Sequence, residues 1–427
     1  MTTTAESTPE TTLGRAVTSV CALVLFAALY ALDRRGLFLW NGRWSQDPWP
    51  LTFGTYAGLT ALLPWVPTAQ RPRATLLGSV LVGTVLLRWL IVVPLLLAWL
   101  APRVARKSWP NWLKLLLLLG GWVLVTFLSW HGPHGVRLRY TSFVFYWSFL
   151  PAPLICLVVE RSRGQLDGAS PLDEWLYLLA PPRFFTPFLQ PIGAARFIAS
   201  AGAPRTPRLA LRGLLLGLYG MLGYFVIQYT RYAIKNPSDD FPLPQDPWFI
   251  VQNGFRIYAI NATIIFGAVA QFRLLGFDLG SGFNFPFLAR SMADFYRRWN
   301  YYFFEFASSM VYWPLVTRLR RWLPLSLAYV VAGYPSILLG VWALDNVFAQ
   351  FPLRPNGESM IQQLADWRKL LGYVSIWSLI IVPQALLASP LRRVRRFRWW
   401  RAVSHVATVT LCISALVVVF VLGVTVY

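Results

Sequence analysis

Residues 113–130 read LKLLLLLGGWVLVTFLSW, an apolar run in which Lys114 is the single charge. Its length is close to the roughly 20 residues with which a helix crosses the hydrocarbon core of a bilayer. Similar runs recur along the chain, so the sequence predicts an all-α, multi-pass integral membrane protein with about eight to ten transmembrane helices. The other runs are Ala16–Leu32, Leu51–Val66, Leu76–Leu100, Tyr140–Val159, Leu209–Thr230, Phe249–Ala270, Leu323–Leu344, Leu370–Leu387 and Ala402–Val426.

The composition of the 427-residue chain supports this class, because 56% of its residues are hydrophobic and only 13% are charged. Soluble domains carry about 25% charged residues, so a cytosolic enzyme, a disordered protein and a fibrous repeat are excluded. The net charge is +22, from 39 Lys and Arg against 17 Asp and Glu. Because the arginines cluster between apolar runs, we expect membrane lipid, and not nucleic acid, as the partner and the cell membrane as the location.

The chain begins with a polar, threonine-rich stretch, and we expect residues 1–14 to form a disordered tail and residues 15–427 a single membrane domain. No small-residue cleavage site precedes Asp33, so the first apolar run is interpreted as an anchor. Prolines and glycines inside other runs predict re-entrant and interfacial helices. No cysteine spacing indicates a disulfide framework or a metal site. The cysteines are Cys21, Cys156 and Cys412.

Residues 282–300, GFNFPFLARSMADFYRRWN, place charges among aromatic side chains between two apolar runs. Such charges have to be paired or face water. On one helix Asp294 and Arg298 lie a turn apart, and Glu305 follows on the face of Arg298. The pattern fits an amphipathic surface helix with internal ion pairs or the wall of a polar tunnel, and Ser291–Arg318 is predicted as an interfacial or half-buried helix.

This stretch resembles the membrane-bound O-acyltransferases, especially the bacterial polysaccharide and alginate O-acetylation proteins and the D-alanine transfer protein of teichoic acid. The similarity is carried by two elements. The first is the segment from Asn284-Phe285-Pro286 to Ala289-Arg290-Ser291, and the second is Arg298-Trp299-Asn300. Looser similarity extends over residues 140–350, for example at Gln190-Pro191-Ile192 and at Val311–Leu315.

The resemblance implies helices arranged around a central cavity and the transfer of an acyl group to a hydroxyl of a cell-envelope carbohydrate or similar acceptor. The donor would be a thioester of CoA or of a carrier protein, acting as co-substrate without a bound cofactor, and partner proteins of envelope modification are expected. Asn300 would orient the catalytic site. The residues expected to line the cavity are Asn284, Arg297, Arg298, Trp299, Tyr312 and Trp342.

One departure from the family concerns its general base, a histidine that follows a tryptophan in a later apolar run. Here Trp342 is followed by Ala343. Asp345 is one alternative base, because burial raises the pKa of a carboxyl group, although it also fits a polar residue at a helix end. His131, in a Trp-His-Gly triplet, is either a displaced base or part of a polar turn.

If neither group serves as base, the chain would be a non-catalytic scaffold that binds a lipid or an acyl chain. Loss of a general base lowers a rate by about 10²–10⁴-fold, so the sequence leaves both an acyltransferase and a pseudoenzyme open. A transporter is disfavoured, because the apolar runs show no inverted repeat.

Overall fold

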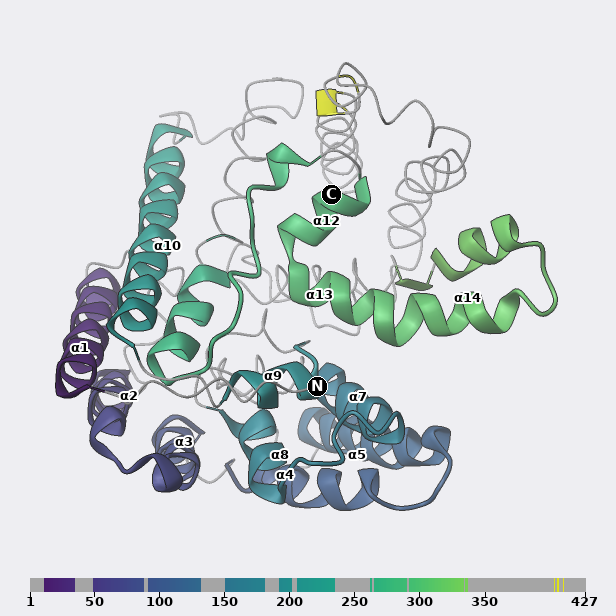
Figure 1. Cartoon of the computed structure of the whole chain (residues 1–427), viewed down its shortest axis with the longest axis horizontal. Helices are drawn as coiled ribbons and strands as arrows, with labels where there is room; N and C mark the ends of the chain where they lie inside the picture. Colours follow the sequence, from purple (N-terminus) through teal and green to yellow (C-terminus); the bar gives the residue numbers. More distant parts are fainter. Residues whose placement is uncertain are drawn as a thin grey trace. The chain divides into compact units, whose positions relative to one another are not determined.

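The computed structural model describes residues 11–34, 49–87, 91–131, 150–180, 192–201, 206–234, 262, 265–289, 292–333 and 335–336, with the single positions 403, 405, 406 and 410. Figure 1 shows that these ranges consist mostly of helices, and no strand occurs among them. The expectation of an all-α chain therefore holds for this part of the protein.

The predicted transmembrane architecture is wrong for the described ranges, in which no helix is long and apolar enough to cross a membrane. The run at 51–66 becomes α2 (Trp49–Leu62), a helix of 14 residues followed by a short 3₁₀ turn. The run at 76–100 is divided between α3 (Arg71–Leu87) and α4 (Val92–Ala105). A helix of 14 residues is about 21 Å long, and the hydrocarbon core is about 30 Å thick.

The chain divides into two compact units, and the boundary at residues 221 and 222 falls inside α10. Unit 1 comprises residues 1–221 and 264–281, and unit 2 comprises residues 222–263 and 282–427. Besides α2, α3 and α4, unit 1 contains α1 (Thr12–Arg34), α5 (Asn111–His131), α7 (Pro151–Ser162), α8 (Pro171–Leu179), α9 (Ala194–Ser200) and the first half of α10 (Pro207–Ile234). Unit 2 contains α12 (Met292–Trp299), α13 (Tyr301–Phe306), a π-helical turn (Ala307–Tyr312) and α14 (Trp313–Leu319).

Local sequence signals set several helix ends. Proline occupies the first position of α7, α8 and α10, where its fixed φ suits a helix and its missing N–H removes no bond. A capping box opens α8, because the Ser170 hydroxyl accepts from Asp173 N while the Asp173 carboxylate accepts from Ser170 N. The helix ends at Leu179, before the prolines that follow Ala180, and a residue that precedes proline disfavours the helical conformation.

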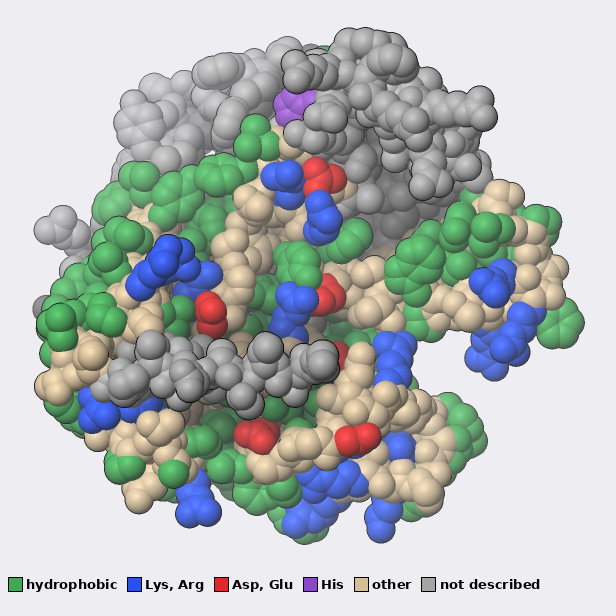
Figure 2. All heavy atoms as spheres, in the orientation of Figure 1, with side chains coloured by type: hydrophobic (Ala, Val, Ile, Leu, Met, Phe, Trp, Pro, Cys, Tyr) green, Lys and Arg blue, Asp and Glu red, His purple; other side chains and the backbone are tan. Residues whose placement is uncertain are grey.

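Large apolar side chains are exposed on several helices of unit 1. Figure 2 shows hydrophobic side chains (green) over broad areas of the face drawn. Large apolar patches on a protein surface are typical of sites that contact lipid or another protein. Exposed examples are Leu77 and Leu81 on α3, Leu96 and Trp99 on α4, Leu116 and Leu124 on α5, and Leu211 and Leu215 on α10.

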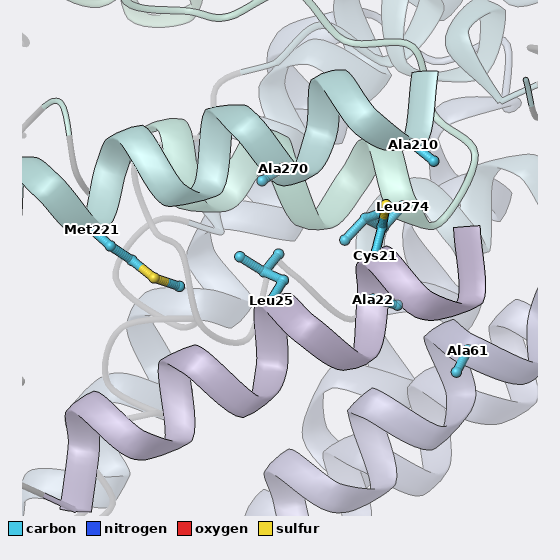
Figure 3. Close-up of a cluster of buried hydrophobic side chains, with 8 residues drawn as sticks. All are labelled: Cys21, Ala22, Leu25, Ala61, Ala210, Met221, Ala270 and Leu274. Carbon is cyan, nitrogen blue, oxygen red and sulfur yellow. The ribbon is translucent and has the colours of Figure 1, made fainter. Parts of the chain in front are cut away.

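Helix α1 packs on α2, α10 and residues 265–274 through a cluster of mostly small side chains (Figure 3). The cluster consists of Cys21, Ala22, Leu25, Ala61, Ala210, Met221, Ala270 and Leu274. The Ser19 hydroxyl adds a hydrogen bond of 2.6 Å to the carbonyl oxygen of Ala61. Burial raises the pKa of the Cys21 thiol, which therefore stays protonated at neutral pH.

Replacing Gly217 with alanine is expected to loosen this cluster. A Cβ at position 217 would lie 2.5 Å from Leu25 Cδ1 and 3.3 Å from Ala270 Cβ. Overpacking of this kind costs about 1–3 kcal/mol, which should appear as a lower midpoint of thermal unfolding. Gly267→Ala is the matched control, because its Cβ meets nothing within 4 Å. Equal midpoints for the two variants would contradict the close packing at Gly217.

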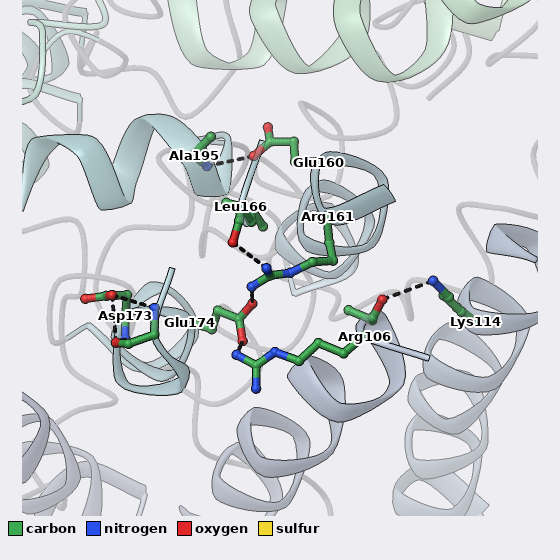
Figure 4. A network of polar contacts seen from close by, with 10 residues as sticks. Arg106, Lys114, Glu160, Arg161, Leu166, Asp173, Glu174 and Ala195 are labelled. Atoms are coloured by element: carbon green, nitrogen blue, oxygen red, sulfur yellow. Dashed lines mark hydrogen bonds and ion pairs between the residues drawn. The ribbon is translucent and has the colours of Figure 1, made fainter. Parts of the chain in front are cut away.

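A buried network of ion pairs joins α4, α7 and α8 (Figure 4). Glu174 on α8 is fully buried, and its carboxylate accepts hydrogen bonds from Arg106, which follows α4, and from Arg161 on α7. Glu160 is also buried and accepts from Ala195 N at 2.7 Å, at the start of α9. Charged groups are tolerated inside a protein only with such partners, so the network fixes how these helices pack in unit 1.

Candidate functional site

In unit 2, the segment that begins at Gly282 folds back on the junction between α12 and α13. Asn284 N donates to Arg298 O at 2.8 Å, and Tyr301 N donates to Gly282 O at 2.8 Å. Gly282 has φ +69°, which glycine adopts without strain, whereas Phe285 holds the left-handed φ of +42° as a non-glycine residue. The two halves of the 282–300 motif are therefore in direct contact.

The charges of α12 form a small ion-pair cluster. Asp294 accepts from Arg297 Nη2 at 2.7 Å and from Arg298 Nε at 2.9 Å, which confirms the predicted pair one turn apart. Arg298 Nη1 also approaches Asn284 O at 3.4 Å. The Arg297 side chain is 57% exposed and that of Arg298 is 26% exposed, so one arginine faces solvent and the other is half-buried.

An aromatic layer lies beneath these charges. Phe283, Phe295 and Trp299 are buried. The ring centroid of Trp299 lies 5.4 Å from that of Phe295 and 6.0 Å from that of Phe283. Polar groups on one side and packed aromatic rings on the other make α12 an amphipathic helix with internal ion pairs.

Asn300 separates α12 from α13. Its φ of −151° interrupts the helix, and its Oδ1 accepts from Phe303 N at 3.1 Å, which caps α13. The stretch predicted as a helix over 291–318 is therefore divided into two helices, a π-helical turn and α14. Arg298 and Glu305 belong to different helices, so the shared face expected from their spacing is wrong.

Tyr312 lies at the end of the π-helical turn, in an aromatic group. Its ring stacks on that of Tyr329 with centroids 6.4 Å apart, and Trp313 meets both rings edge to face. Burial raises the pKa of the Tyr312 phenol, and the neighbouring Tyr329 adds to this shift. The phenol stays protonated at neutral pH and is available as a hydrogen-bond donor.

His405 contacts the 282–300 motif from a distant part of the sequence. Its Nδ1 lies 2.8 Å from Ala289 O. Because a carbonyl oxygen only accepts hydrogen bonds, Nδ1 is the donor in this contact, and in the neutral ring the lone pair is then on Nε2. An imidazole held in this tautomer has the chemistry of a general base. The sequence alone does not single out His405, because 116 residues separate the two partners of this contact.

The structure thus brings Asn284 into contact with the Arg298–Asn300 end of the same motif. His405 contacts this motif at Ala289. His131 is the last residue of α5 in unit 1, and its side chain lies outside the described part. Trp342, Ala343 and Asp345 lie outside the described residues. A base at His131 or Asp345 remains a prediction.

No group of three or more His, Cys, Asp or Glu side chains in the described ranges is arranged to hold a metal ion. Comparison with known protein families and with curated proteins finds no match for this chain. A functional assignment therefore depends on the chemistry of the residues at the α12–α13 junction and on the motif that they form.

Proposed function

We propose that the protein is an O-acyltransferase that moves an acyl group from a thioester donor, CoA or a carrier protein, to a hydroxyl of a cell-envelope carbohydrate or similar acceptor. The observation that carries the proposal is the hydrogen bond between His405 Nδ1 and Ala289 O. It supplies a histidine to the motif that resembles the membrane-bound O-acyltransferases, in place of the one missing at Ala343.

In the proposed reaction, His405 Nε2 takes the proton of the acceptor hydroxyl while the hydroxyl oxygen bonds to the thioester carbonyl carbon. The carbon–sulfur bond then breaks, the sulfur leaves with the bonding electrons, and the imidazolium returns the proton to it. The exposed guanidinium of Arg297 offers a positive charge to the phosphate groups of an acyl-CoA donor.

The second candidate is a non-catalytic scaffold that binds a lipid or an acyl chain. It is favoured by the way the polar groups of the motif are used within the fold. Arg298 and Asp294 pair with each other, and the Oδ1 of Asn300 caps α13. A scaffold of this kind would retain these contacts and would not turn over a thioester.

The location that we propose is the cell membrane, and the last turn of α14 with the turn that follows it supports this location. Arg318, Arg320 and Arg321 are exposed, and the Trp322 side chain is 83% exposed beside them. Arginines next to an exposed tryptophan suit the headgroup region of an anionic membrane. Each arginine near such a surface contributes about 1 kcal/mol.

The double variant Arg320→Gln with Arg321→Gln is expected to bind vesicles of phosphatidylglycerol at least about tenfold more weakly than the wild type, because it loses two of these charges. The measurement is co-sedimentation of the full-length protein with the vesicles. Arg208→Gln with Arg212→Gln, two exposed arginines of α10, serves as the control. Equal loss in both double variants would show that total charge, and not this turn, governs binding.

The reaction itself is tested by following thiol release from acetyl-CoA by the purified full-length protein, with and without a hydroxyl-bearing glycan. Release that increases with acceptor concentration supports the acyltransferase. Tight retention of an acyl chain without thiol release supports the scaffold and contradicts the enzyme.

A further inference from the structure

An apolar groove lies between α2 and α3 in unit 1, away from the residues used above. Its volume is about 340 Å³, and its walls are apolar apart from Thr55. This volume lies within the range of about 300–1,000 Å³ that is typical of small-molecule sites. Residues that line it include Gly54, Gly58 and Leu62 on α2, Val66 after it, and Ala74 and Leu81 on α3.

Two glycines one turn apart keep the groove open. A Cβ added at Gly54 or Gly58 would meet nothing within 4 Å, so the space beside α2 is free at both positions. On α3, the space beside Gly78 is occupied by the Leu59 side chain. Leu59 Cδ1 lies 2.2 Å from the position that a Cβ on Gly78 would take. Glycine inside a helix costs about 1 kcal/mol relative to alanine, so the hollow is maintained against the preference of the helix.

A tryptophan and an arginine adjoin one end of the groove in the sequence, next to its lining residues Val66 and Ala74. Leu59 packs on Gly78 and a short turn joins the two helices, so Val66 and Ala74 lie at the same end. Next to them in the sequence, Trp65 is 49% exposed and Arg73 is exposed. Within the described ranges Arg73 forms no ion pair with a carboxylate.

A buried arginine holds this end in shape. Arg71 donates from Nε to Val66 O at 2.8 Å and from Nη2 to Pro64 O at 2.9 Å. Trp65 Nε1 donates to the Ser19 hydroxyl at 3.0 Å, which ties the turn to α1. The turn that carries Trp65 and precedes Arg73 is therefore ordered before any ligand arrives.

We propose that this groove binds one acyl chain of an anionic phospholipid. The chain lies along Gly54 and Gly58, where apolar surface is removed from water, and the phosphate faces the Arg73 guanidinium. Trp65 lies at the boundary between tail and headgroup, where an amphipathic ring is favoured. The proposal goes beyond acyl transfer and does not depend on it, because no residue of the groove belongs to the 282–300 motif.

The test is photocrosslinking of the full-length protein in vesicles of phosphatidylcholine and phosphatidylglycerol, with a phosphatidylglycerol probe that carries a diazirine on its acyl chain. Peptide mapping should find adducts concentrated in residues 54–81. Gly58→Phe should reduce their yield at least about tenfold, which corresponds to about 1.4 kcal/mol of binding free energy. Gly121→Phe is the matched control, a half-exposed helical glycine of α5 with the same open surroundings.

A second arm tests the headgroup. Arg73→Gln should remove the preference of the groove for phosphatidylglycerol over phosphatidylcholine, whereas Arg212→Gln on α10 should preserve it. Adducts spread evenly over the exposed helices, or equal yields from Gly58→Phe and Gly121→Phe, would overturn the proposal and indicate only general lipid contact. Adducts in residues 54–81 without any headgroup preference would overturn the role of Arg73.

Discussion

Replacing His405 with alanine is expected to lower the rate of acyl transfer by about 10²–10⁴-fold, the usual effect of removing a general base. The hydrogen bond from Nδ1 to Ala289 O orients the imidazole and leaves Nε2 as the basic atom. Without it, the acceptor hydroxyl would have to attack the thioester while still protonated. The measurement is the rate of thiol release in the presence of the acceptor, under conditions where the wild type turns over.

The control for this prediction is His131→Ala, because His131 is the other histidine that the sequence offers as a base. It should retain the wild-type rate. Loss of activity in His131→Ala or in Asp345→Asn, with His405→Ala unaffected, would place the base elsewhere and contradict the role of His405. Circular dichroism of each variant distinguishes a chemical effect from a failure to fold.

Replacing Glu174 with alanine is expected to destabilise unit 1 by about 3–5 kcal/mol, because removing one partner of a buried ion pair leaves the other charge uncompensated. Glu174 is fully buried and binds two arginines, of which Arg161 is itself mostly buried. The midpoint of denaturant unfolding should fall accordingly. The midpoint for Glu174→Gln should lie between those of the wild type and Glu174→Ala, because glutamine retains the shape of the side chain and part of its hydrogen bonding.

Asp173→Ala provides a matched control one residue away. Asp173 is part of the capping box at the exposed start of α8, and loss of a helix cap costs about 1 kcal/mol. The expected order of stability is wild type, then Asp173→Ala, then Glu174→Ala. If Glu174→Ala were as stable as Asp173→Ala, the network in Figure 4 would not be important for stability.

Features that depend on neighbouring residues could be predicted from the sequence. The Asp294–Arg298 pair follows from helical spacing, and the end of α8 follows from the prolines after Ala180. The helical class also follows, because long apolar runs with few charges favour helices. Each of these signals lies within one continuous stretch of the sequence.

Features that depend on distant residues or on backbone geometry could not be predicted in the same way. Hydropathy did not show that the run at 76–100 is divided between α3 and α4, and it therefore predicted one span in place of two helices. Asn300 was interpreted through the chemistry of its side chain, but its Oδ1 caps α13. The contact of His405 with Ala289 arises only from tertiary structure, which spacing along the chain does not encode.

The most direct test of the proposed function is the detection of the new ester bond. The full-length protein is incubated with an isotope-labelled acetyl thioester and a hydroxyl-bearing envelope glycan, and the glycan is examined by mass spectrometry. We predict an O-acetylated glycan that carries the label, formed by the wild type and nearly absent with His405→Ala. Unlabelled glycan with the wild type, while the thioester stays bound and intact, would contradict acyl transfer.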